Sequence, residues 1–157
     1  MNRMPRPGEP APRFEGVTQD GERVKLEDYR GRTLLLYFYP RDDTPGCTKQ
    51  ACSLRDGAAD LAAAGVAVLG VSTQDAASHR AFAQKYGLRF PLLADTTGEV
   101  GRAYGVLGGG GIGGWLRERL GLAARVTFVI DPAGRIARVV ERPDVGHHAE
   151  EILALVR

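Results

Sequence analysis

The sequence predicts a single α/β domain over residues 1–157. Short apolar runs alternate with segments of helical periodicity, in the order 34–39, 47–64, 65–73 and 75–87. Strand–helix–strand–helix alternation is typical of a sheet with a parallel core. A chain of this length, with 43% hydrophobic and 25% charged residues, can bury such a core without requiring a second domain.

The elements expected in the first part of the chain follow from turn and period signals. Four prolines predict an extended lead-in, and alternation around Asp20-Gly21 predicts a β-hairpin. Gly65 is placed to end a helix. In order, we expect an extended lead-in (1–12), a hairpin (14–26), one helical turn (26–29), a buried strand (34–39) and a helix from Pro45 to about Ala64.

The second part of the chain continues the alternation. Gly87 is placed to end a helix that begins at Asp75, and the turn at Pro132–Gly134 joins two strands. In order, we expect a strand (65–73), a helix (75–87), a short strand (89–95), a weak helix (98–105), a Gly-rich surface loop (107–122), a strand (125–131), its hairpin partner (135–141) and an amphipathic C-terminal helix (147–157).

The 107–122 segment does not fit this alternation. Six glycines in the seven residues 108–114 oppose regular structure, and the following WLRERLGL could form one or two helical turns. The run lacks the Lys-Ser/Thr ending of a phosphate-binding loop, which disfavours nucleotide binding. We expect a surface loop whose helical turn packs Trp115 onto the body; the alternative is a membrane or partner contact through Trp115, Leu116 and Leu120.

Charge and composition exclude several classes of function. A net charge of +2 with both signs interspersed gives no footprint for nucleic acid or membrane. The basic, Pro-rich start lacks the apolar centre of a signal peptide, and no run approaches the length of a membrane span. We therefore expect a cytoplasmic protein. In that reducing compartment, two cysteines indicate a redox or metal role rather than a structural disulfide.

Cys47 follows a buried strand through a turn that begins a helix. Thr44 is a residue type that caps helices, and Pro45 suits the first helical position because it has no N–H to lose. Unpaired N–H groups and the helix dipole in this first turn favour thiolate over thiol. Asp42 and Asp43 either face the sulfur and oppose the thiolate, or bond loop and helix N–H groups or point to water. We expect a cation from elsewhere in the chain near Cys47.

Three interpretations compete for the cysteines. Structural or inert thiols need no special surroundings, whereas Cys47 lies at a strand-to-helix turn of the kind that carries function. A zinc site would add His147 and His148, but adjacent histidines point to different faces of a helix. We expect both to be capping or surface residues, with His79 on a polar helix face. The third interpretation is a catalytic thiol with Cys52 as its resolving partner.

The spacing of the two cysteines adds a condition to that third interpretation. Residues five apart in a helix are about 7.5 Å apart along its axis and about 140° apart around it, beyond the reach of a disulfide. A bond between Cys47 and Cys52 therefore requires the first turns of the helix to unwind. Oxidation to a sulfenic acid, followed by its capture by a nearby thiol after local unfolding, gives a coherent two-cysteine peroxidase cycle.

The segment FYPRDDTPGCTKQACSLRD resembles the active-site segment of the peroxiredoxins. Their signature, Pro-x-x-x-Thr-x-x-Cys, is matched by Pro40, Thr44 and Cys47. The further cysteine five residues on is similar to the bacterioferritin-comigratory or Q-type subfamily. The likeness covers nearly the whole chain, through the segments APRF, DGERVKLEDYRG, GVAVLGVST, FPLLAD and RVTFVIDPAGRI.

The resemblance implies a thioredoxin-like fold, with a central mixed sheet flanked by helices and an N-terminal β-hairpin extension. It implies reduction of hydrogen peroxide and organic hydroperoxides without a cofactor or metal, and re-reduction by thioredoxin or another dithiol. A monomer is expected because both thiols lie in one chain. The alternative, from another class, is a peroxide-sensing thiol redox switch that acts on a protein partner through residues 107–122.

The resemblance also assigns roles to the residues that carry the chemistry. Cys47 attacks the terminal peroxide oxygen, and the Thr44 hydroxyl can hydrogen-bond both the thiolate and the peroxide. The family's active-site arginine matches Arg125 of RVTFVID, which supplies the missing cation. Arg125 would hold the thiolate form and stabilise charge on the departing oxygen.

The remaining implied roles concern the loop and the second thiol. Pro40 would shape the loop and shield the thiolate from water. The backbone N–H groups of Gly46 and Cys47 would donate to the bound peroxide. Cys52 would resolve the sulfenic acid to give an intramolecular disulfide, which an external dithiol then reduces.

Overall fold

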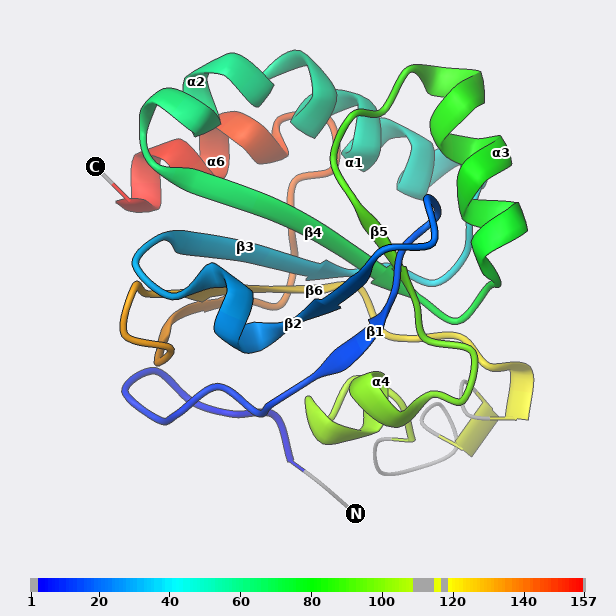
Figure 1. The fold of residues 1–157 in the computed structure, drawn as a ribbon, viewed down its shortest axis with the longest axis horizontal. Coiled ribbons are helices and arrows are strands. Elements are labelled where there is room, and N and C mark those ends of the chain that lie inside the picture. The colour runs from blue at the N-terminus through cyan, green and yellow to red at the C-terminus, as the bar shows by residue number, and fades with distance from the viewer. Residues whose placement is uncertain (1–2, 109–114, 117–118, 157) are drawn as a thin grey trace.

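The centre of the computed structural model is a five-stranded mixed sheet (Figure 1). The structure describes residues 3–108, 115–116 and 119–156. The strand order is β5-β4-β3-β6-β7, formed by β3 (Thr33–Phe38), β4 (Val66–Ser72), β5 (Leu92–Ala94), β6 (Val126–Ile130) and β7 (Ile136–Val140). Strands β5, β4 and β3 are parallel, as the alternation predicts, while β6 pairs antiparallel with both β3 and β7. The mixed sheet implied by the family resemblance is therefore confirmed.

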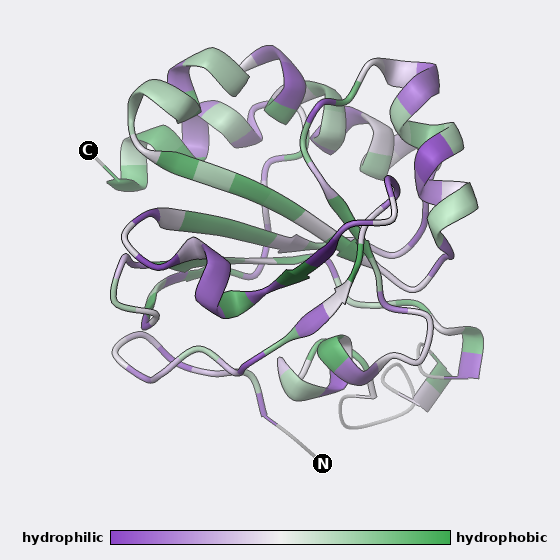
Figure 2. Cartoon of the chain, in the orientation of Figure 1, coloured by the Kyte–Doolittle hydropathy of each residue, from purple (hydrophilic) through white to green (hydrophobic). Residues whose placement is uncertain are grey.

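Alternate residues of β3 build two hydrophobic layers, one on each face of the sheet. Leu34, Leu36 and Phe38 face one layer, while Leu35 and Tyr37 face the other. The second layer lies under α1 (Pro45–Asp56), α2 (Ala58–Ala63), α3 (Ala76–Tyr86) and α6 (His148–Val156). Figure 2 shows the central strands as hydrophobic, with hydrophilic residues interspersed along the helices. This layering confirms a sheet flanked by helices.

The opposite face carries the predicted N-terminal hairpin. It consists of β1 (Glu15–Val17) and β2 (Arg23–Lys25), which pair antiparallel, followed by the single turn η1 (Leu26–Tyr29). Gln19, only 5% exposed, accepts from Leu92 N at 2.7 Å and donates to Phe90 O at 3.1 Å. These bonds join the hairpin to the edge of the sheet at β5. The short helix α4 (Glu99–Ala103) lies on this same face (Figure 1).

The extended lead-in is bonded to the body. Gly8 N donates to Ile136 O at 2.7 Å, and Ile136 N donates to Glu9 O at 2.8 Å. Ala11 N donates to Gly134 O at 2.9 Å. The prolines of this segment thus lead the chain along β7 before it enters the hairpin.

The prediction of one helix from Pro45 to Ala64 is wrong, because the helix is interrupted at Gly57. Gly57 ends α1 and precedes α2. A Cβ atom at this position would lie 2.4 Å from the Cβ of Ala149 in α6. The glycine therefore allows close approach of α6, a requirement set by tertiary packing that local periodicity does not carry.

Two other predicted elements differ from the structure. The strand predicted at 89–95 is regular only over Leu92–Ala94, after Pro91, which has no N–H to give to a ladder. Within 107–122, residues 115–116 and 119–120 are helical, while 109–114 and 117–118 lie outside the described residues. Trp115 does not pack onto the body: it is 60% exposed, with the Arg119 guanidinium 5.4 Å from its ring centre.

No helix among the described residues has the length and apolar character needed to cross a bilayer.

Candidate active site

The start of α1 holds Cys47 where the sequence predicts it, in the first helical turn. Thr44 takes the N-cap position in an extended conformation, Pro45 follows at the first helical position, and Cys47 is 1% exposed. The predicted capping by the Thr44 side chain is wrong, because its hydroxyl donates instead to Arg41 O at 3.1 Å. That bond closes the loop before the helix and leaves N–H groups of the first turn without a side-chain cap.

Arg125 supplies the cation that the local sequence lacks. Its Nη2 donates to Cys47 Sγ at 3.3 Å, a charge-assisted contact that stabilises negative charge on the sulfur. Arg125 immediately precedes β6, and the antiparallel register pairs Val126 with Phe38 at the end of β3. The end of β3, which leads into the Cys47 loop, therefore lies beside the start of β6, which follows Arg125.

Gly46 and Gln50 fix the guanidinium over the sulfur. A Cβ atom on Gly46 would lie 2.9 Å from Arg125 Nη2, so a larger residue would displace the guanidinium. Gln50, fully buried, accepts from Arg125 Nη1 at 2.9 Å through its Oε1 atom. Gln50 is not among the residues that the sequence pattern identifies. Its position three residues after Cys47, on the same helix face, is the signal that could have identified it.

Two buried donors close to this site have no partner among the described residues, Gln50 Nε2 and the Tyr37 hydroxyl. Tyr37 is 1% exposed. Burial, followed by the charges at Cys47 and Asp42, raises the pKa of Tyr37 well above its ordinary value. The phenol therefore remains a neutral donor in the layer between β3 and α1.

Asp42 takes none of the three arrangements considered from the sequence, because its carboxylate bonds buried side chains instead of the sulfur, backbone N–H groups or water. Its carboxylate accepts from the Tyr39 hydroxyl, the Ser78 hydroxyl and His79 Nδ1, each at 2.7 Å. Burial raises the pKa of the Asp42 carboxyl, but the hydrogen bond and charge of His79 and the two hydroxyl donors outweigh burial, so this pKa lies below its ordinary value. The negative charge of Asp42 is thereby held by α3.

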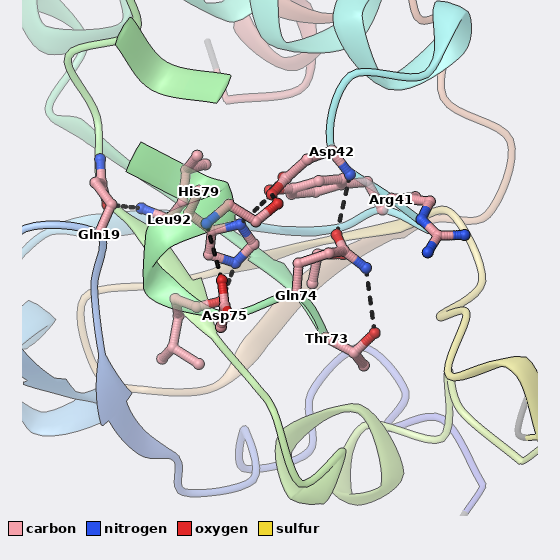
Figure 3. Close-up of polar contacts among 12 residues, drawn as sticks. Gln19, Arg41, Asp42, Thr73, Gln74, Asp75, His79 and Leu92 are labelled. Atoms are coloured by element: carbon pink, nitrogen blue, oxygen red, sulfur yellow. Dashed lines mark hydrogen bonds and ion pairs between the residues drawn. The ribbon is translucent and has the colours of Figure 1, made fainter. Parts of the chain in front are cut away.

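The prediction that His79 lies on a polar helix face is wrong, because its side chain is fully buried. Nε2 lies 3.0 Å from Leu93 O, an oxygen that can only accept, so this nitrogen carries a proton. Nδ1 faces the Asp42 carboxylate (Figure 3). His79 thus links the active-site loop to β5. Its fold-dependent partners are distant in sequence, which is why periodicity alone misplaced it.

Asp43 is held by an exposed pair at the other end of α3. Its carboxylate bonds Lys85 Nζ at 2.7 Å and the Tyr86 hydroxyl at 2.6 Å. The hydrogen bond from Lys85 is the main cause that lowers the pKa of Asp43. Asp43 also has a φ of 58°, the one positive value at a non-glycine residue among those the structure describes. Both aspartates are therefore bonded to α3 side chains.

Cys52 lies in the middle of α1, seven residues after Pro45, and is half-buried. Both cysteines are free thiols in the structure. Since the whole of Pro45–Asp56 is helical, the two sulfurs belong to residues that are about 7.5 Å apart along the axis. The condition set by the spacing therefore holds: the first turns of α1 must open before these thiols can bond.

The two C-terminal histidines differ from each other. His147 is exposed, as predicted, with 74% of its side chain accessible. The same prediction is wrong for His148, which is fully buried: Nε2 lies 2.9 Å from Thr127 Oγ1 on β6, and Nδ1 lies 2.8 Å from Glu151 Oε1. No group of three or more His, Cys, Asp or Glu side chains suited to a metal ion occurs in the described part of the chain.

The burial of His148 leads to a pH prediction for stability. Burial lowers the pKa of His148, and Glu151 only partly opposes this. The unfolded chain therefore binds a proton more readily than the folded one. The contribution of the buried, neutral His148 to the free energy of unfolding is fully present above the unfolded pKa of about 6.5. As the pH drops from there toward the folded pKa, this contribution falls by at most about 1.4 kcal/mol per pH unit. Urea titrations of wild type and His148→Gln should show the variant losing this slope.

The exposed neighbour His147 provides the matched control for that titration. His147→Gln should keep the wild-type dependence on pH, since its side chain is largely in water. An equal slope in wild type and His148→Gln would contradict the role given to the buried ring.

The fold and this arrangement of thiol, helix start and arginine define a class of thiol-dependent enzymes, and comparison with known proteins identifies the family. The AhpC/TSA family model matches residues 7–139. The chain therefore belongs to the AhpC/TSA family. Within it the chain is a peroxiredoxin, a thiol peroxidase, similar to the Bcp and Q-type proteins, as the following relatives show.

A bcp peroxiredoxin of Coxiella burnetii is 42% identical over 150 residues, which cover 93% of this chain and 95% of the relative. The crystal structure of peroxidoxin BcpB from Mycobacterium tuberculosis superposes with a TM-score of 0.84 at 32% identity, covering 98% of this chain and 97% of that one. The bacterioferritin comigratory protein of Xanthomonas campestris, described with an alkyl peroxide reduction activity, gives a TM-score of 0.82 at 29% identity, covering 91% and 89%. The thioredoxin-like fold implied by the sequence resemblance is thus confirmed.

Proposed function

We propose that Cys47 is the nucleophile that reduces the hydroperoxide. The observation that carries this proposal is the 3.3 Å contact between Arg125 Nη2 and Cys47 Sγ, at a helix start with uncapped N–H groups. The thiolate attacks the terminal peroxide oxygen, so an S–O bond forms while the O–O bond breaks. The departing oxygen takes up a proton and leaves as water or an alcohol, and Cys47 becomes a sulfenic acid.

The residues around Cys47 support this step in different ways. Arg125 would stabilise the thiolate and the charge that develops on the departing oxygen. The backbone N–H groups of Gly46 and Cys47, with the Thr44 hydroxyl, would bind the peroxide after that hydroxyl turns from Arg41 O. Pro40 would shield the sulfur from water.

The second half of the proposed cycle uses Cys52. After the first turns of α1 open, the Cys52 thiolate attacks the sulfenic sulfur, a disulfide forms and the hydroxyl leaves with a proton as water. A dithiol then reduces the disulfide by thiol exchange. Thioredoxin is the proposed reductant. The cytoplasm is the proposed location, because thiols stay reduced in such a compartment. Because both thiols lie in one chain, we propose that the enzyme works as a monomer.

Hydrogen peroxide and alkyl hydroperoxides are the proposed substrates. The reaction requires only a terminal peroxide oxygen within reach of the sulfur, and the alkyl peroxide reduction described for the Xanthomonas campestris relative supports the broader class. The whole 1–157 chain is proposed to act as one thioredoxin-like domain, in line with a single sheet that takes strands from residue 33 to residue 140.

The test of this cycle is Cys52→Ser. The variant should consume about one equivalent of peroxide per chain and then stop, because the sulfenic acid at Cys47 has no internal partner. Wild type, with thioredoxin, thioredoxin reductase and excess peroxide, should turn over steadily. Measuring peroxide consumed per chain distinguishes the two. Continued turnover of Cys52→Ser with thioredoxin would contradict the resolving role, and a wild type that oxidises once without turnover would favour a redox switch.

A further inference from the structure

The loop that precedes Cys47 is fixed to the segment between β4 and α3. Pro40 O accepts from Ser72 Oγ at 3.3 Å and from Gln74 Nε2 at 3.4 Å. Asp42 N donates to Gln74 Oε1 at 2.9 Å. Figure 3 shows the Gln74 side chain lying between Asp42 and Thr73. One carbonyl and one amide group of this short loop, those of Pro40 and Asp42, are thus bonded to the same neighbouring segment.

A buried cluster also holds this loop, through the side chain of Asp42. We call Asp42 with Tyr39, Ser78 and His79 the Asp42 anchor. The Asp42 side chain is 5% exposed and accepts from all three neighbours, while the second ring nitrogen of His79 bonds Leu93 O on β5. Each donor and acceptor in the cluster is therefore paired with another part of the core, and water screens it little.

The first turns of α1 pack into the core and are also bonded to Arg125. Cys47 and Gln50 both accept from the guanidinium of Arg125, and the missing Cβ of Gly46 leaves room for it. Farther along α1, Ser53 Oγ accepts from Ala149 N at 3.2 Å and so joins the helix to α6. The stretch between the Asp42 anchor and Ser53 is thus bonded to Arg125, while its two ends are bonded to α3 and to α6.

We propose that Asp42 is a positioning residue whose buried anchor holds residues 40–43 in place. The first turns of α1 then stay closed during peroxide attack. They open only between the Asp42 anchor and Ser53. The proposal rests on the proposed function, with Cys47 as nucleophile and Cys52 as resolving thiol. Asp42 does not touch the peroxide; it acts by fixing the chain that presents Cys47. Loss of the anchor should therefore favour the open state over the closed one.

The consequence is that two rate constants move in opposite directions. The closed state reacts with peroxide and the open state forms the disulfide, so a shift toward the open state slows the first step and speeds the second. In Asp42→Asn, we expect the second-order rate of peroxide consumption to fall about tenfold and disulfide formation to accelerate severalfold, because removing one charge leaves the buried His79 without its charged partner. A general loss of structure would lower both rates together.

The experiment measures both steps on the full chain by rapid acid quench. Residual peroxide gives the rate of the first step, and mass spectrometry of alkylated protein gives the rate of disulfide formation. Asp43→Asn is the matched control: Asp43 is the next residue and also bonds α3, but its pair with Lys85 is exposed. Since exposed pairs are weak, both of its rates should stay within about twofold of wild type.

Ser78→Ala keeps the experiment decisive if Asp42→Asn fails to fold, because it removes one of the three donors and leaves the pair of Asp42 with His79. As in Asp42→Asn, peroxide consumption should slow and disulfide formation should accelerate, but by smaller factors. Unchanged rates in these variants, or rates that fall by the same factor, would overturn the inference. A wild type that forms neither sulfenic acid nor disulfide would instead refute the proposed function.

Discussion

Replacing Cys47 with serine is expected to reduce peroxide consumption to the uncatalysed background. A serine hydroxyl is not ionised at neutral pH, so the Arg125 guanidinium and the start of α1 would surround a group that cannot act as the nucleophile. The substitution is nearly isosteric, and the buried position should keep its packing. Peroxide consumption with thioredoxin, followed over time, measures the loss.

The control for Cys47→Ser is Cys52→Ser, which retains the nucleophile and should still show its first oxidation. Circular dichroism of both variants verifies that α1 and the sheet are intact. A Cys47→Ser protein with activity near that of wild type would exclude Cys47 as the nucleophile.

Replacing Arg125 with alanine is expected to lower the rate of peroxide reduction by about 10²–10³-fold, the usual size for loss of one preorganised donor at a reacting centre. The variant loses the contact to Cys47 Sγ and leaves Gln50 Oε1 without its donor. Arg125→Lys should recover only part of the rate, since one ammonium cannot reproduce the planar fork that reaches both atoms.

Two measurements check the prediction for Arg125: the peroxide rate, and the fraction of Cys47 present as thiolate, followed by its ultraviolet absorbance in a background of Cys52→Ser. Both should fall together in Arg125→Ala. Arg138→Ala, on the exposed side of β7, is the matched control and should change neither. An unchanged thiolate fraction and rate in Arg125→Ala would show that the helix start activates the sulfur alone.

Local signals in the sequence were enough to place the thiol. The apolar run that forms β3, Pro45 at the first position of α1 and the Asp75 and Gly87 caps of α3 all depend on neighbours within a few residues. For this reason the strand-to-helix turn that presents Cys47 is where the pattern predicts it.

Contacts between distant segments account for what the sequence did not reveal. Arg125 reaches Cys47 across 78 residues only because β6 pairs with β3 in one register, and it was identified through the family resemblance. His79 and His148 look like surface residues in a local helical pattern, yet the fold buries both against β5 and β6. A buried polar side chain needs a partner, and that partner is known only once the strands are in place.

The break at Gly57 and the partners of Asp42 have the same origin. The need for a glycine arises from Ala149 in α6, and the charge of Asp42 is held by residues from α3. Asp42 could therefore be recognised as a charge near the thiol, while the sequence could not show that this charge is directed away into a buried pair.

The central claim is that Cys47 and Cys52 of one chain join after peroxide oxidation, and peptide mapping tests it most directly. Trypsin cleaves after Arg41, Lys49 and Arg55, which places the two cysteines in separate peptides. After one equivalent of peroxide and alkylation without reductant, we expect peptide 42–49 linked to peptide 50–55, in a protein that remains a monomer on a non-reducing gel. Two separate alkylated peptides, or the same linkage found only in a covalent dimer, would contradict it.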